Sequence, residues 1–257
     1  MAGAYFCLDA YRRILERARA LDYRICEFRT FPERDARPIL LVRHDLDHSL
    51  ICALPMARLE AELGVRATYF VQVACDFYNL LSKTGRACVR ELTQLGHEVG
   101  LHYESERYLD GGNTQLRLEM ELLSDISGQP CLSGSQHVPI ASPGFDAAGS
   151  LVNEAYAPRF TRSPMHYISD SLLAWRQATP DALLDRGVSF QFLTHPENWP
   201  VGEPARSFED AIDRALQLER DSLEQNRCET LRFYRELLDR RAELDRAFEA
   251  RRAAEES

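Results

Sequence analysis

Residues 38–48 read Pro-Ile-Leu-Leu-Val-Arg-His-Asp-Leu-Asp-His, an aliphatic run that ends in charged and metal-capable side chains. The β-branched and aliphatic part, with a proline at its edge, predicts a buried strand. Because alternate residues of a strand share a face, Asp45 and Asp47 are expected to point the same way. Two adjacent carboxylates repel each other, which favours protonation of one or capture of a cation. The alternative is an exposed turn with two solvated acids.

A second polar stretch, residues 96–106, reads Gly-His-Glu-Val-Gly-Leu-His-Tyr-Glu-Ser-Glu. Apolar residues alternate with glycine and histidine at its centre, which predicts a strand. His102 and Glu104 would then share the forward face, and Glu106 would follow in the loop beyond. Imidazole nitrogen and carboxylate oxygen are good ligands for zinc and similar divalent ions. Beside the paired aspartates, a ligand role is favoured over a structural role for His102.

Up to about residue 200 the chain alternates between strand-like and helix-like segments. After a predicted helix at 5–22, we expect strands at 38–44, 67–73, 98–103, 131–136 and 188–194, and helices at 51–63, 85–95 and 113–126, with a loop-rich section before the last strand. This alternation predicts right-handed β-α-β units and a parallel sheet, either open or closed into a barrel. In both arrangements the chemistry gathers at the carboxyl ends of the strands, where Asp45, Asp47, His102 and His195 fall.

Composition limits the class of protein. An apolar fraction of 45% is ample for a buried core, and a formal net charge of −9 argues against nucleic acid as the main partner. No apolar run is long enough for a membrane span, and the N-terminus lacks the pattern of a secretory signal. The seven cysteines are odd in number and form no C-x-x-C pair, which is typical of reduced thiols in a cytoplasmic protein.

The C-terminal segment, at about 206–254, is charged and helical, with a broken apolar stripe. We interpret it as one or two helices that pack on the domain or on a partner subunit, in which case the protein would be a homo-oligomer. The heptads are too irregular to predict a coiled coil. We expect a single domain over residues 1–257, with its catalytic core at about 38–200.

Several motifs occur along the chain in a recognisable order. They are RHDLD at 43–47, GVRATYF at 64–70, GHEVGLH at 96–102, SQHVP at 135–139, YISDS at 167–171 with Trp175, and LTHP at 193–196. In these motifs the chain resembles the polysaccharide deacetylase superfamily, in the subgroup whose first motif is Arg-His-Asp, a hydrophobic residue and Asp. The resemblance implies a distorted (β/α) barrel of about seven strands, which agrees with the alternation above.

The resemblance also implies roles for individual residues. Asp45 would be the general base that activates water, and Asp47 and His102 would hold a divalent cation, zinc by preference. His195 would be the general acid that protonates the leaving amine, and Asp170 would orient it. Two further residues are assigned to the substrate: Trp175 as an apolar wall, and Arg43.

The chain departs from the superfamily at the third metal ligand. Glu106 stands where relatives have a second histidine, so this ligand is open between Glu106, Glu104 and His137. His137 itself falls where many members place an arginine that contacts the base. His44, His48 and His97 are interpreted as structural or as supporting the ligands. 

The resemblance implies a metal-dependent hydrolase that removes an acetyl or other N-acyl group from an amino sugar. A nucleotide- or lipid-linked glycan precursor is the expected substrate, because no secretion signal is present. Two alternatives remain open. One is a hydrolase of another C–N bond, such as a cyclic imide or ureide, and the other is a member of the fold that binds glycan without turnover.

Overall fold

The computed structural model describes residues 6–108, 112–139 and 150–255. Its contacts group the chain into two compact units, Met1–Leu216 and Gln217–Ser257. The first unit contains all the described strands and every predicted site residue. The second consists of the later part of helix α7 (Phe208–Glu255). A single domain and a homo-oligomer joined by this segment both stay predictions.

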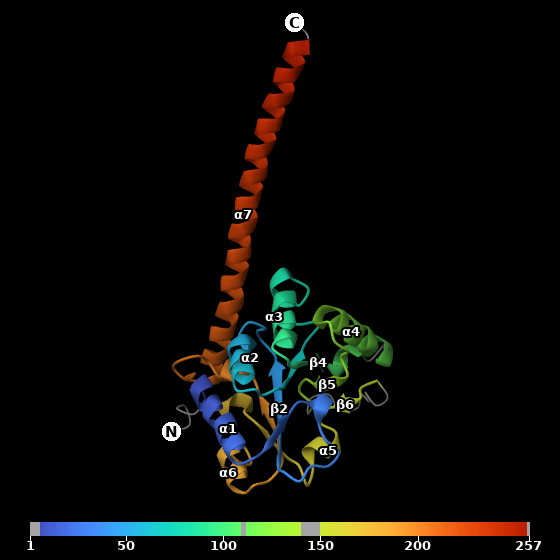
Figure 1. Cartoon of the computed structure of the whole chain (residues 1–257), viewed down its shortest axis with the longest axis vertical. Helices are drawn as coiled ribbons and strands as arrows, with labels where there is room; N and C mark the ends of the chain where they lie inside the picture. The colour runs from blue at the N-terminus through green and yellow to red at the C-terminus, as the bar shows by residue number, and fades with distance from the viewer. Residues whose placement is uncertain (1–5, 109–111, 140–149, 256–257) are drawn as a thin grey trace. The chain divides into compact units, whose positions relative to one another are not determined.

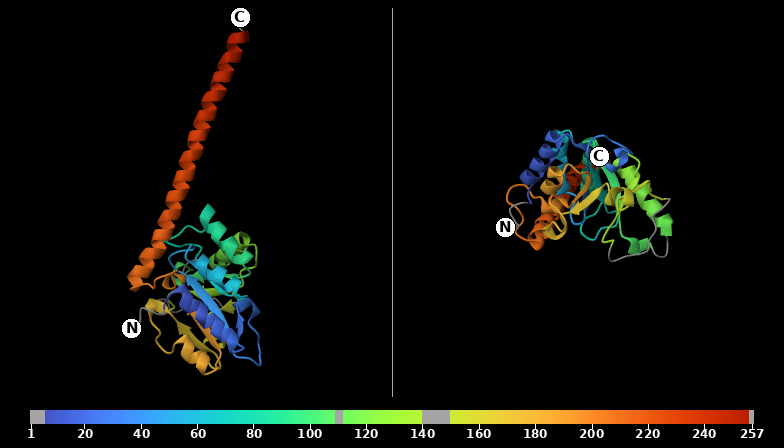
Figure 2. Two further views of the ribbon diagram at one scale, coloured as in Figure 1. Left: turned by 60° about the vertical axis from the view of Figure 1, so that its left-hand side comes forward. Right: turned by 90° about the horizontal axis from the view of Figure 1, so that it is seen from below.

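The first unit is built on one curled sheet of parallel strands, which Figures 1 and 2 show with helices on its outer side. The strands are β1 (Arg24–Cys26), β2 (Ile39–Leu46), β3 (Thr68–Val71), β4 (Glu98–Tyr103), β5 (Ser133–Gln136), β6 (Asn153–Glu154), β7 (His166–Ser169) and β8 (Phe190–Thr194). Seven of them follow the order β6-β5-β4-β3-β2-β8-β7, and β1 also pairs with β2. The predicted distorted (β/α) barrel is therefore confirmed.

The sequence did not reveal three of these strands. β1, β6 and β7 are only three, two and four residues long. Runs of two or three residues, as in β1 and β6, give too few alternations to separate a strand from a loop. β7 lies in the section that we expected to be loop-rich, and it pairs with β8 from His166 to Ser169.

Helices cover the outside of the sheet. They are α1 (Leu8–Ala20), α2 (Ala53–Glu62), α3 (Lys83–Gln94), α4 (Gly112–Ser127) and α6 (Pro180–Asp185). The short helix α5 (Pro158–Thr161) lies on the inner face instead, where Phe160 joins the buried cluster of Leu41 and Phe70. Each helix in the series α6, α1, α2, α3 and α4 contacts the next one. Gly64 and Gly96 follow the ends of α2 and α3 with φ angles of +68° and +93°, a conformation that glycine adopts without a steric penalty. None of the described helices is long and apolar enough to cross a membrane.

A buried polar network joins the first two helices to the sheet. The Glu60 carboxylate of α2 is fully buried. It accepts hydrogen bonds from the hydroxyl of Tyr11 on α1 and, at 2.6 Å, from the hydroxyl of Tyr69 on β3. His44 Nε2 of β2 lies 2.7 Å from the same carboxylate. A buried charge is tolerated only when it is well hydrogen-bonded, so this network fixes how α1 and α2 lie on the strands.

We expect Glu60→Gln to destabilise the first unit by about 1–3 kcal/mol, because the amide nitrogen cannot accept the bond that one of the tyrosine hydroxyls donates. Denaturant unfolding followed by circular dichroism measures the change. Glu62→Gln is the matched control on the same helix, since Glu62 is exposed and pairs with Arg12 at the surface, and its unfolding midpoint should stay where it is. Equal midpoints for both variants would show that the network is dispensable.

Candidate active site

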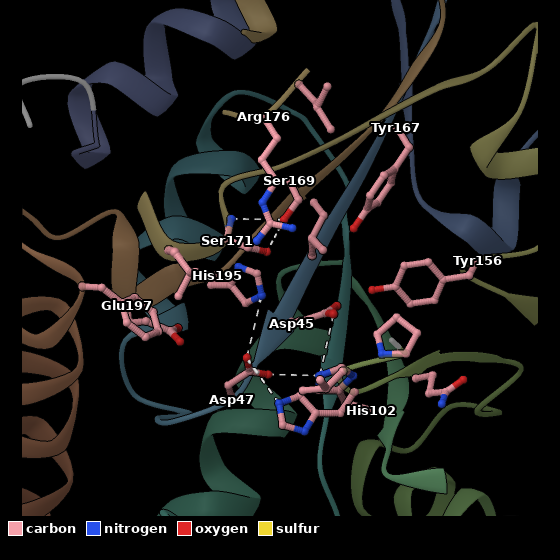
Figure 3. A pocket seen from close by; sticks show the side chains of 18 of the residues that line it. Asp45, Asp47, His102, Tyr156, Tyr167, Ser169, Ser171, Arg176, His195 and Glu197 are labelled. Atoms are coloured by element: carbon pink, nitrogen blue, oxygen red, sulfur yellow. Dashed lines mark hydrogen bonds and ion pairs between the residues drawn. The ribbon is translucent and has the colours of Figure 1, made fainter. Parts of the chain in front are cut away.

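Most of the predicted site residues gather around one cavity of about 680 Å³. The cavity lies at the carboxyl ends of the strands, and Figure 3 shows its lining. Asp45 reaches it from β2 and His102 reaches it from β4, while Asp47, His137 and His195 directly follow β2, β5 and β8. These strands run parallel in one sheet, so their carboxyl ends lie at the same edge, and side chains distant in sequence face the same space.

Asp45 is held by a buried arginine. Arg43 Nε donates to Asp45 Oδ1 at 2.9 Å and Arg43 Nη2 donates to Oδ2 at 2.7 Å, a bidentate pair. Ser135 Oγ donates to Asp45 Oδ2 at 3.1 Å, and Gln191 Oε1 accepts from Arg43 Nη1 at 3.0 Å. Burial raises the pKa of Asp45, but Arg43 and the nearby histidines more than offset this, so its pKa is lowered. Asp45 therefore stays ionised.

The environment of Arg43 differs from the one we expected. Its side chain is fully buried and does not line the cavity, so the structure gives it no contact with a substrate. Its guanidinium carbon lies 4.4 Å from the centroid of the Tyr156 ring and 5.5 Å from that of Phe70. Arg43 orients Asp45, and its predicted place in substrate binding is not carried forward.

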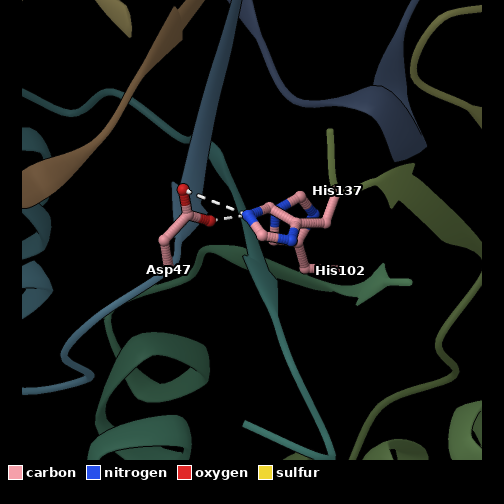
Figure 4. A group of neighbouring side chains, drawn as sticks. All are labelled: Asp47, His102 and His137. Carbon is pink, nitrogen blue, oxygen red and sulfur yellow. Dashed lines mark ion pairs between the residues drawn. The ribbon is translucent and has the colours of Figure 1, made fainter. Parts of the chain in front are cut away.

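Asp47, His102 and His137 form a compact group whose ligand atoms all lie within 4.8 Å of one another (Figure 4). His102 Nδ1 donates to the Ser135 carbonyl oxygen at 2.9 Å, since a carbonyl can only accept. Nε2 can then present a lone pair towards Asp47 Oδ1, 3.0 Å away. His137 Nε2 lies 3.8 Å from Asp47 Oδ2.

This group fits a divalent cation. Asp47 Oδ1 is buried and lies 3.0 Å from His102 Nε2, so it accepts a hydrogen bond only while Nε2 carries a proton; with Nε2 free to bind a cation, the oxygen lacks the partner that a buried carboxylate oxygen needs. Burial raises the pKa of Asp47, but the hydrogen bond from His102 and the charges of His195 and His137 lower it further than that, which keeps the ligand ionised. Two imidazoles and one carboxylate form a donor set that suits zinc, with room for water as a fourth ligand.

The two glutamates lie differently. Glu106 is exposed on the 3₁₀ turn Ser105–Tyr108 and is not part of the group. β4 ends at Tyr103, so the alternation that places His102 towards the cavity stops before Glu106 is reached. Glu104 Oε1 lies 3.4 Å from His137 Nδ1, where it can orient the ring. Of the three candidates for the third ligand, the structure brings only His137 into place.

His195 is backed by a buried carboxylate. Its Nδ1 lies 2.6 Å from Asp170 Oδ1, and its backbone N–H donates to Asp170 Oδ2 at 3.0 Å. Trp199 Nε1 also donates to Asp170 Oδ2, at 2.6 Å. His195 Nε2 lies 3.7 Å from Asp47 Oδ2, on the cavity side. Burial lowers the pKa of His195, but Asp170, followed by Asp47, raises it well above its ordinary value, so the ring carries a proton that it can donate.

The predicted substrate contact of Trp175 is not seen, whereas Trp199, which was given no role, contacts a proposed catalytic residue. Trp175 stacks on Phe6, with ring centroids 5.3 Å apart, and does not line the cavity. Trp199, which no motif singled out, holds Asp170. The aromatic lining comes instead from Tyr156, Tyr167 and Phe208, and nothing in the sequence around Tyr156 marks it. Trp175 is therefore not carried forward as the apolar wall.

No protein-family model matches the chain, and no curated protein matches it. Among solved structures the chain is similar to a deacetylase from Streptococcus pyogenes in complex with acetate, with 12% identity and a TM-score of 0.39 over 50% of this chain and 61% of that one. It is similar to a family 4 acetyl xylan esterase from Clostridium thermocellum in complex with a cobalt ion, with 14% identity and a TM-score of 0.38 over 73% of this chain and 84% of that one. It is also similar to a CE4 family pseudoenzyme from Bacillus anthracis, with 13% identity and a TM-score of 0.41 over 74% of this chain and 63% of that one. The chain thus spans less than two thirds of two of these three proteins.

We expect His137→Ala to weaken binding of Zn²⁺ by about tenfold or more, because it removes one of three protein ligands. Glu106→Ala is the matched control and should bind Zn²⁺ as the wild type does. Isothermal titration of the metal-free proteins with Zn²⁺ measures both affinities. A loss of affinity in Glu106→Ala with no loss in His137→Ala would reverse the assignment of the third ligand.

Proposed function

We propose that this protein is a hydrolase that removes an acetyl group from the nitrogen of an amino sugar, with a divalent cation held by Asp47, His102 and His137. The observation that carries the proposal is the meeting of three different groups in one cavity. They are a carboxylate fixed by a buried arginine, a set of cation ligands, and a histidine backed by a buried carboxylate. Metal-assisted hydrolysis of an unactivated amide uses all three functions.

A bound divalent cation would supply Lewis-acid polarisation of the acyl carbonyl and would lower the pKa of water towards neutrality. Asp45 then takes the proton from the attacking water. Its Oδ2 lies 3.7 Å from His102 Nε2, beside the ligand group, and Arg43 keeps it ionised for this task. His195 donates a proton to the leaving nitrogen from Nε2, because Asp170 holds Nδ1. An amine is a poor leaving group until it is protonated.

The cavity supports a sugar as the substrate. Its volume of about 680 Å³ is within the range of small-molecule sites, and its lining combines the rings of Tyr156 and Tyr167 with polar side chains. Arg176 also lines it and could meet a phosphate of a nucleotide- or lipid-linked glycan precursor. We propose that class of substrate and zinc as the cation, and a cytoplasmic location stays a prediction from the sequence.

Asp45→Asn should lower the release of acetate from N-acetylated amino sugars by about 10²–10⁴-fold and leave the affinity for Zn²⁺ unchanged, because it removes the base and keeps the ligands. Acetate is measured by a coupled assay and zinc binding by titration. Asp213→Asn, at an exposed position, is the control and should keep full activity. Full activity in Asp45→Asn would remove Asp45 from its role as base. If the wild type opens cyclic imides but releases no acetate, the proposed substrate class is wrong. If it binds glycan but turns over neither acetylated sugars nor cyclic imides, it is a non-catalytic member of the fold.

His195→Ala should depress kcat for an acetamide substrate by about 10²–10⁴-fold, because the leaving amine loses its proton donor. An activated acetyl ester, whose leaving group needs no proton, should be hydrolysed nearly as fast as by the wild type. Asp170→Asn should give a smaller defect, since it loosens the ring without removing it. Steady-state rates on the two substrates measure the contrast. If His195→Ala slows the amide and the ester equally, His195 serves binding or structure and the acid lies elsewhere.

A further inference from the structure

Asp47 also belongs to a second group of potential ligands, whose other two members have no part in the proposed reaction. Asp47, His48 and Glu197 each offer a ligand atom, and these atoms all lie within 4.8 Å of one another. His48 follows Asp47 directly in the chain, and Glu197 lies on the 3₁₀ turn Pro196–Asn198 beyond β8. All three line the cavity, and the Glu197 carboxylate is drawn beside Asp47 in Figure 3.

Glu197 provides independent evidence for a ligand. Only 4% of the residue is exposed. Its Oε1 lies 2.8 Å from His48 Nδ1, but its Oε2 is buried and has no hydrogen-bond partner within the part of the chain that the structure describes. A buried carboxylate oxygen without a partner is unfavourable, and native structures rarely keep one without a bound water or ion.

The charges around the cavity also favour a bound cation. Asp45 pairs with the permanently charged Arg43, whereas the ion pairs of Asp47 and Glu197 among the described residues are with histidines. Asp47 and Glu197 are two acidic side chains within one cluster; Glu197 Oε2 is buried and accepts no hydrogen bond from the described residues, and Asp47 Oδ1 accepts one only while His102 Nε2 is protonated. A cation that bound between them would satisfy both oxygens at once and would relieve their mutual repulsion.

We propose that Asp47, His48 and Glu197 form a second divalent-cation site, with Asp47 as the ligand shared with His102 and His137. Two carboxylates and one imidazole make this site richer in oxygen than the first, so it should accept Mn²⁺ readily, whereas the two imidazoles of the first site suit Zn²⁺. Two cations that share a carboxylate in proteins lie roughly 3.5–4 Å apart and interact magnetically when both are paramagnetic. The inference goes beyond the proposed function, for which the first group alone suffices.

Titration of the metal-free protein with Mn²⁺ tests the second site, because the electron paramagnetic resonance signal of free Mn²⁺ reports how many equivalents are bound. Wild type should bind two equivalents. Glu197→Gln and His48→Ala should each weaken one of the two by about tenfold or more and leave the other in place. Glu203→Gln, an exposed glutamate in the following segment, is the control and should bind two. A protein loaded first with one equivalent of Zn²⁺ should still bind one Mn²⁺.

The outcomes separate the two sites. One equivalent in the wild type, weakened by His137→Ala and unaffected by Glu197→Gln and His48→Ala, would overturn the second site and leave the first intact. Two equivalents that persist in both Glu197→Gln and His48→Ala would also overturn it. Circular dichroism of each variant shows that it is folded, and the use of two variants at different positions keeps the test decisive if one of them does not fold.

Discussion

The buried ion pair between Arg43 and Asp45 is the constraint on which the inner face of the barrel depends. Both residues stand on β2 and point the same way, and both side chains are almost fully buried. Removing one partner of such a pair leaves an uncompensated buried charge, at a cost of about 3–5 kcal/mol. The remaining donors and acceptors are filled by Ser135 of β5 and Gln191 of β8, so the pair fixes strands on both sides of β2 as well as the orientation of Asp45.

The same pair explains why two aspartates, two residues apart, can have different tasks. Arg43 bonds to both oxygens of Asp45, and the hydroxyl of Ser135 also donates to Oδ2. Among the described residues no arginine pairs with Asp47, whose two oxygens lie beside histidines instead. A carboxylate bound to a guanidinium is poorly available to a cation. A carboxylate among imidazoles can bind a cation together with them. The environment, and not the residue type, separates the base from the ligand.

The sequence predicts the barrel and the convergence of Asp45, His102 and His195 for one physical reason. Parallel strands end at the same edge of a sheet, so polar residues at predicted strand ends must lie near one another. It does not predict the third ligand, because that depends on where β4 stops. Glu106 lies in the exposed turn after β4, whereas His137 follows β5, which pairs with β4 from residue 101. The sequence does not predict the role of Trp199 either. Its indole donates to Asp170 because β7, which the sequence did not reveal, pairs with β8.

The outer face of the same strands supports the site from behind. Because side chains alternate, the residue before each proposed acid or base points away from the cavity, towards the helices. His44 precedes Asp45 and Thr194 precedes His195, and His44 Nδ1 lies 2.6 Å from Thr194 Oγ1. The other nitrogen of His44 meets Glu60, the buried carboxylate of α2. β2 and β8 are thus joined by side chains on both faces, and the distance between the proposed base and acid is set by the core of the barrel and not by the loops that follow it.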